Sequence, residues 1–355
     1  MNCVMKQVKS VALCIALATN AVAEPFDGFE FLFSWAEMKD EATAAALAEI
    51  GVTDATARGP AGFAAARKFG IRPYCTFMPV GPHKQVLGEE AQRRHDFVTG
   101  ADLAGKSIPE AERRRIVEKR RIAAGCRFGG EPDTMPDVCT TDRIACFLSD
   151  TNCVMSKAKI DRLLADNPEA GGVALDFIGF TNLRSCECED CKARFLAYAR
   201  RENLEPNESS RDRFFRASLV SYINTLADYV RSVRPGMKVT IHLYPVFLPD
   251  PIYGKDLRVD TAQETVAWYF QWPDAKIADY TRRIVSGKYQ PGSMGVPFVG
   301  LNATPGQALA SKTPERLDAE LRIVLASGAR RLGVCNGWEM VKPGYREVFL
   351  KYRRD

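Results

Sequence analysis

Two acidic residues, Asp176 and Glu339, stand toward the ends of short apolar runs that alternate like buried strands. Glycoside hydrolysis needs two carboxyl groups, because one protonates the leaving oxygen while the other acts as nucleophile or base. Burial beside aromatic rings raises the pKa of one carboxyl, and hydrogen bonds keep the other ionised. We therefore predict Asp176 as a catalytic residue and Glu339 as its partner. Asp274, which follows Trp272-Pro273, is a third candidate, although its position also suits a helix cap.

Polar and aromatic side chains cluster near the same run ends and suit a pocket for a sugar. Aromatic faces are platforms for sugar rings, and their polar edges donate hydrogen bonds. The predicted substrate-binding residues are Ser34, Trp35, His242, Tyr244, Gln271, Trp272, Asn302 and Trp338, with Asp54 grouped beside them. His242 fits a buried structural histidine equally well. Because the chain has only three histidines, a His-rich metal site is excluded.

The segment Cys186-Glu187-Cys188-Glu189-Asp190-Cys191 places three thiols within six residues. This spacing suits a tetrahedral zinc site with a fourth ligand from elsewhere in the chain. Cys146 is the preferred fourth ligand; Cys153, Cys139 and Cys126 are the alternatives. Four thiolates leave no open position for substrate, so the predicted zinc is structural. Disulfides between this triplet and the cysteines at 126–153 are the alternative, because disulfides are natural in an exported protein.

Residues 1–23 have the three parts of a secretory signal peptide. Lys6 and Lys9 precede an apolar stretch, which ends in Ala21-Val22-Ala23. The stretch is too short to span a bilayer, where about 20 residues are needed. We expect cleavage after Ala23 and a secreted or periplasmic mature protein with no membrane span.

Eight apolar runs alternate with amphipathic helical stretches, a rhythm typical of a (β/α)8 barrel. The runs cover residues 29–35, 52–57, 71–80, 172–180, 238–247, 264–272, 296–302 and 331–339. The predicted fold is one α/β domain, a TIM barrel over 24–355, with an insertion at about 82–156 after the third strand. Because active sites of such barrels gather at the C-terminal ends of the strands, we expect the insertion to cover part of the mouth. A doubly wound open sheet is the alternative fold.

Charge and composition exclude several classes of protein. Apolar residues make up 46% and charged residues 26% of the 355 residues, as in a soluble globular chain. The net charge of +5 is too mild for a nucleic-acid partner. The basic runs 113–115 and 119–121 indicate a solvated helix face within the insertion.

The stretch from Gly172 to Phe180, the cysteine triplet and then Lys192-Ala193-Arg194-Phe195 resemble TIM-barrel glycoside hydrolases of the broad amylase and β-galactosidase type. The cysteine loop is similar to the zinc cluster of family 42 β-galactosidases. The close match covers about residues 146–200. The resemblance implies a barrel fold and a carbohydrate substrate.

The chain departs from these families at three positions. Family 42 has an Asn-Glu pair at the end of strand four, where this chain has Leu175-Asp176. Amylase-type barrels carry an arginine at the place of Ala174, and the strand-seven glutamate of many retaining enzymes is replaced here by Asn302. The sequence therefore favours an exported glycoside hydrolase. The alternative is a catalytically inactive barrel that binds carbohydrate.

Overall fold

The computed structural model describes most of the chain after the predicted leader. The described residues are 25–33, 37–89, 92–93, 96–97, 100–123, 144–180, 184–243, 253–267, 272–301, 312–335 and 337–354. The predicted signal peptide, residues 1–23, lies outside them. No helix of the described part is long and apolar enough to cross a membrane.

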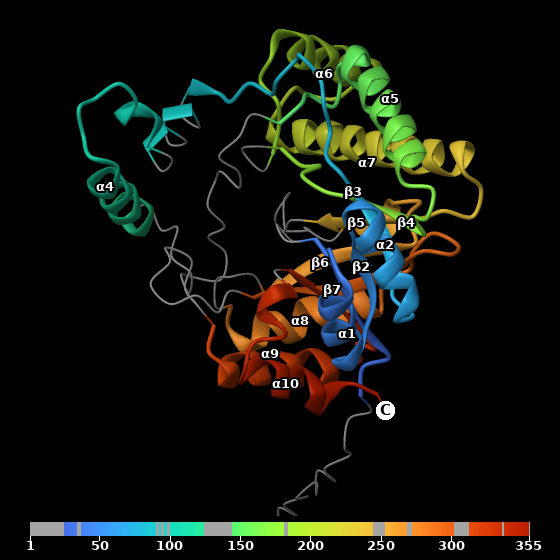
Figure 1. Cartoon of the computed structure of the whole chain (residues 1–355). Coiled ribbons are helices and arrows are strands. Elements are labelled where there is room, and N and C mark those ends of the chain that lie inside the picture. The colour runs from blue at the N-terminus through green and yellow to red at the C-terminus, as the bar shows by residue number, and fades with distance from the viewer. Residues whose placement is uncertain are drawn as a thin grey trace, which may run out of the picture.

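Eight parallel strands form a closed barrel in chain order (Figure 1). The strands are β1 (Gly28–Phe33), β2 (Val52–Thr56), β3 (Arg72–Phe77), β4 (Gly172–Leu175), β5 (Lys238–Leu243), β6 (Thr261–Ala267), β7 (Met294–Gly300) and β8 (Arg331–Cys335). Strand β1 pairs with β8 and closes the ring. The predicted (β/α)8 barrel is therefore confirmed, and an open doubly wound sheet is excluded.

Helices surround the barrel on its outside (Figure 1). The helices of the described residues are α1 (Glu41–Glu49), α2 (Gly59–Lys68), α4 (Glu110–Ala123), α5 (Asp150–Asp166), α6 (Glu189–Arg201), α7 (Glu208–Val233), α8 (Asp274–Val285), α9 (Pro314–Ala326) and α10 (Tyr345–Tyr352), and of these α4 is set apart from the barrel. Three short 3-10 turns are η1 (Ala101–Leu103), η2 (Gly254–Asp256) and η3 (Gly337–Glu339). Polar side chains of Asp40, Ser149, Asn207 and Thr313 cap α1, α5, α7 and α9, because they accept hydrogen bonds from otherwise unpaired N–H groups.

Side-chain alternation along the strands separates the lumen from the layer under the helices. Phe29 and Phe31 on β1 belong to the large core between strands and helices, where Phe29 meets Phe349 of α10 edge-on. Leu32 points the opposite way and packs with a separate buried group that includes Tyr74, Ala174, Phe298 and Cys335. Because side chains alternate between the two faces of a strand, this second group fills the lumen.

The N-terminal end of the lumen holds a charged network. The carboxylate of Asp54 accepts hydrogen bonds from Arg72 at 3.0 Å and Arg331 at 2.8 Å. Arg331 also pairs with buried Glu30 at 2.7 Å. Since Arg72 and Arg331 are the first residues of β3 and β8, the network lies at the end of the barrel opposite the mouth. The expectation that Asp54 lies at the pocket mouth is therefore wrong.

The described parts of the predicted insertion hold η1, α4 and the start of α5. Figure 1 shows α4 set apart from the strands. Its residues Arg113, Arg114 and Arg115 are exposed, and two of them pair with glutamates of the same helix, so the solvated face is confirmed for this first basic run, whereas Arg120 of the second run is half-buried and pairs with Asp102. Helix α5 begins at Asp150, inside the range assigned to the insertion. That the insertion covers the mouth stays a prediction.

Candidate functional site

Asp176 directly follows β4 and lies at the C-terminal end of the barrel. Its backbone N–H donates to Phe77 O at 2.8 Å, so the pairing with β3 continues one residue past the strand. The backbone N–H of Phe177 donates to Asp176 Oδ1 at 2.8 Å. Phe177 has a φ of +52°, a left-handed conformation that costs energy for a residue with a bulky side chain. This sharp turn ends the strand and fixes one oxygen of the carboxyl group.

Burial controls the protonation of Asp176. The residue is 8% exposed, and loss of water around the charged form raises its pKa to about 6, although the bond from Phe177 acts in the opposite direction. No arginine or lysine of the described residues forms an ion pair with it. A carboxyl group that keeps its proton up to about pH 6 is suited to donate that proton to a leaving oxygen.

Gln85 holds the turn that follows Asp176. Its buried side-chain amide donates to Gly179 O at 3.0 Å and to Ala145 O at 3.4 Å. Beyond the turn, the Phe180 ring packs against Phe147 and other aromatic rings. The insertion thereby supports the segment that carries the candidate acid. A single glutamine in a polar segment gave no signal in the sequence that could have identified this contact.

Glu339 does not lie on a strand. Strand β8 ends at Cys335, and Glu339 belongs to η3, so the predicted strand over 331–339 is four residues too long. Only glycine fits at position 337 after the strand, because a Cβ atom there would lie 2.3 Å from the Phe31 ring, which faces the outer core. The alternation that placed Glu339 in the lumen therefore stops before it. The buried carboxylate of Glu339 pairs with Lys342 Nζ at 2.6 Å.

His242 lies inside the barrel and is held in one orientation. Its Nε2 lies 3.1 Å from Thr265 Oγ1, and that hydroxyl donates its own hydrogen to Leu243 O. The imidazole therefore donates from Nε2. Burial lowers the pKa of His242 to about 3, so the ring is neutral, and it lies 4.1 Å from the Phe298 ring. These contacts show a buried lumen histidine.

The remaining predicted residues fall into two groups. Trp272 is buried in the core, edge-on to Tyr280 and covered by the Lys276 ammonium at 4.1 Å. Asp274 is the first residue of α8 rather than its cap, and it pairs with Arg316 at 2.8 Å. Trp338 is half-buried in η3. Ser34, Trp35, Tyr244, Gln271 and Asn302 lie outside the described residues.

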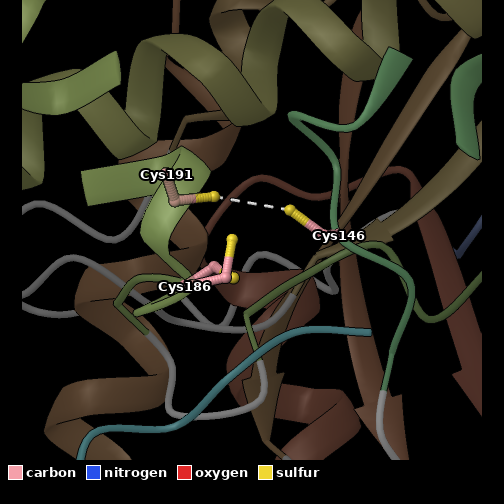
Figure 2. A group of neighbouring side chains, drawn as sticks. Cys146, Cys186 and Cys191 are labelled. Carbon is pink, nitrogen blue, oxygen red and sulfur yellow. Dashed lines mark hydrogen bonds between the residues drawn. The ribbon is translucent and has the colours of Figure 1, made fainter. Parts of the chain in front are cut away.

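Four cysteine sulfur atoms of the described residues lie close together, and Figure 2 labels three of these residues, Cys146, Cys186 and Cys191. We call Cys146, Cys186, Cys188 and Cys191 the four-cysteine cluster; their Sγ atoms all lie within 4.8 Å of one another. Cys146 comes from the segment before α5, Cys186 and Cys188 come from the loop between β4 and α6, and Cys191 lies in the first turn of α6. None of these cysteines is in a disulfide. The cluster could hold a metal ion, and it ties the insertion to the loop that follows Asp176.

The donor set fits a thiolate-bound metal. Zn–S bonds of about 2.3 Å in a tetrahedron place sulfur atoms about 3.8 Å apart, and Cys146 and Cys191 lie 3.4 Å apart. The Val86 N–H donates to Cys186 Sγ at 3.4 Å, and Cys188 and Cys191 lie at the N-terminus of α6. Both features stabilise negative sulfur. Hydrogen bonds from the Cys186 and Cys191 thiols lower the pKa of Cys146, and the same contacts raise the pKa of those two thiols.

Comparison with known proteins gives the fold and no family. No protein-family model matches the chain, and no curated protein matches it in sequence. Solved structures match across more than nine tenths of this chain. They include a β-galactosidase from the psychrophilic Marinomonas ef1 (TM-score 0.52, 10% identity, 92% of this chain and 59% of that one) and a catalytic mutant of a GH42 β-galactosidase from G. stearothermophilus (0.51, 11%, 91% and 55%). An α-L-fucosidase isoenzyme from Paenibacillus thiaminolyticus also matches (0.50, 14%, 92% and 48%).

This chain has a TIM-barrel fold like that of glycoside hydrolases. It spans about half the length of these solved chains. At 10–14% identity, the similarity establishes the architecture. The site must be interpreted from its own residues.

Proposed function

We propose that this protein is an exported glycoside hydrolase that works at the C-terminal mouth of the barrel. The observation that carries the proposal is the buried carboxyl of Asp176, which lies at the end of β4 with a pKa raised to about 6. Catalytic groups of TIM barrels come from the ends of the strands at this face. The glycosidases that share the fold support a carbohydrate substrate.

In the proposed mechanism Asp176 is the general acid. The protonated carboxyl donates its hydrogen to the glycosidic oxygen as the bond to the sugar breaks. The Phe177 N–H stabilises the carboxylate that remains, because it already bonds Oδ1. The second carboxylate is proposed to be Glu339, which Lys342 orients.

We infer the stereochemistry from the strands that precede these two groups, β4 before Asp176 and β8 before Glu339. Strands β4 and β8 stand four positions apart in the eight-stranded ring, so they face each other across it. A separation of about 6.5–9.5 Å leaves room for a water molecule and gives inversion, whereas about 5–5.5 Å gives retention. Facing strands favour the larger separation, and we propose inversion.

The four-cysteine cluster is proposed to hold one structural zinc ion. When bound, zinc would crosslink the segment before α5 to the loop after β4. All four positions around it would be filled by sulfur, so substrate would have no access to the ion.

The direct test is to screen the purified protein for hydrolysis of aryl glycosides and polysaccharides. We expect turnover that Asp176→Asn abolishes while the fold is retained. Proton NMR of the first product shows whether the anomer is inverted. Export is tested separately, because the N-terminus of the exported protein should be Glu24.

The second candidate function is a catalytically inactive barrel that binds carbohydrate. The position of Glu339 favours it, since this residue lies in a turn and is paired with Lys342 rather than extending β8 into the lumen. Binding of a glycan with no turnover of any member of the same panel would select this function over hydrolysis.

A further inference from the structure

A cavity of about 540 Å³ lies on the outer flank of the barrel, between α7 and the segment 253–258. Arg213 and Ala217, which line it, lie on a different face of α7 from Phe215 and Leu219 of the core, whereas Val220 both lines the cavity and packs against the core. The cavity is therefore separate from the lumen and from Asp176. We call it the flank groove.

Among the described residues that line the flank groove, cations outnumber anions. Its charged lining residues are Arg213, Arg216, Arg258 and Asp256. Arg213 is exposed and has no ion pair among the described residues. Arg216 pairs with Asp256 at 3.9 Å, and Arg258 is neutralised by Asp228 outside the lining. The guanidinium of Arg213 is therefore the positive charge that the groove itself does not balance.

The neutral lining is rigid and small. The Asn224 side chain donates to Asp256 O at 3.2 Å and accepts from the Arg258 N–H at 2.7 Å, so it locks the two walls together. The Thr225 hydroxyl donates to Ser221 O, which leaves its oxygen as an acceptor toward the groove. The apolar floor is provided by two small side chains of α7, Ala217 and Val220.

We propose that the flank groove binds an acidic polysaccharide through the carboxylate groups of its sugars. A guanidinium group matches a carboxylate with two parallel hydrogen bonds, and Arg213 is positioned at the groove to form them. Sugar hydroxyls meet the hydroxyl acceptors of the groove, while the ring lies on the small apolar floor. This binding goes beyond the proposed hydrolase, and it can fail while hydrolysis at the mouth stands.

The test measures binding alone. The full chain carrying Asp176→Asn, which keeps the glycan intact, is titrated by calorimetry at low ionic strength with an oligogalacturonide and with its carboxyl-reduced neutral counterpart. We expect the acidic glycan to bind at least about tenfold more tightly than the neutral one. Arg213→Gln should weaken binding on the order of tenfold, the effect of one hydrogen-bonded charge pair.

Two matched variants sharpen the result. Asp256→Asn removes the carboxylate that lines the groove, so it should tighten binding. Arg322→Gln removes an exposed arginine on α9, which is paired with Asp318, and should change nothing. Equal affinity for the neutral glycan, or unchanged affinity in Arg213→Gln, would overturn the proposal. Equal binding of poly-glutamate or duplex DNA at the same ionic strength would also overturn it, since the groove would then attract any polyanion.

Discussion

Replacing Asp176 with asparagine should abolish turnover and, at the same time, stabilise the protein above pH 6. The unfolded carboxyl loses its proton near pH 3.8, whereas the native one keeps it until about pH 6. The wild-type fold therefore loses stability as the pH rises through this interval, because the unfolded state gives up its proton first. About two pKa units at about 1.4 kcal/mol each correspond to about 3 kcal/mol. Asp176→Asn has no charge to bury, and its amide oxygen can still accept from Phe177.

The assay is urea unfolding of wild type and Asp176→Asn at pH 8 and at pH 3.5, together with turnover across the same range. We expect the variant to be more stable by up to about 3 kcal/mol at pH 8, and the difference to vanish below about pH 4. Wild-type turnover should fall as the pH rises above about 6, since the proton donor is then lost.

Asp274→Asn is the matched control, because its carboxylate is 63% exposed and pairs with Arg316 at the surface. Its stability should change by less than about 1 kcal/mol at both pH values. The reasoning fails if Asp176→Asn is no more stable than wild type at pH 8, or if its advantage is the same at pH 3.5. Near-wild-type turnover in Asp176→Asn would show that the residue is structural.

Three further predictions concern the supports of the barrel. Arg331→Gln should lower the free energy of unfolding by about 3–5 kcal/mol, because Asp54 loses a charged partner in a buried network. Turnover per folded molecule should be unchanged, and a loss of stability below about 1 kcal/mol in urea unfolding would contradict this prediction. Gln85→Leu should lower the free energy of unfolding by about 1–3 kcal/mol and lower the rate of turnover. Equal kinetics in wild type and Gln85→Leu would show that the turn after β4 does not need the Gln85 side chain. Elemental analysis should find one zinc per chain in wild type and in Cys75→Ala but little in Cys191→Ser; absence of metal together with disulfides by mass spectrometry would exclude the zinc site.

Much of the architecture could be predicted from the pattern of apolar residues. Alternation along β1 is enough to assign Leu32 and Phe31 to opposite faces of the strand, and their packing in separate buried groups agrees with it. The run that ends in Asp176 likewise predicts that this carboxyl lies at the C-terminal end of a buried strand. The spacing of three cysteines is enough to predict a cluster, because thiols so close in sequence can converge on one centre.

Tertiary structure decided where alternation ends and which charges meet. Asp54 has the polar character of a mouth residue, yet the barrel brings Arg72 and Arg331 to it at the opposite end. Glu339 continues the alternation in the sequence, but β8 ends at Cys335, and Glu339 lies in η3, where Gly337 packs closely on Phe31. Both outcomes depend on contacts between segments far apart in sequence.

The sequence by itself therefore determined the repeating strand and helix units of this protein. Each strand and helix buries its own apolar face, and the spacing of the apolar residues on that face is set within the element itself. The structure alone decided the environment of each polar group. The pKa of Asp176 depends on how much water the surrounding turns exclude. The four-cysteine cluster is complete only because Cys146, which precedes α5, lies close to the three cysteines that follow β4. Such distances and burials arise only when the strands close into a ring.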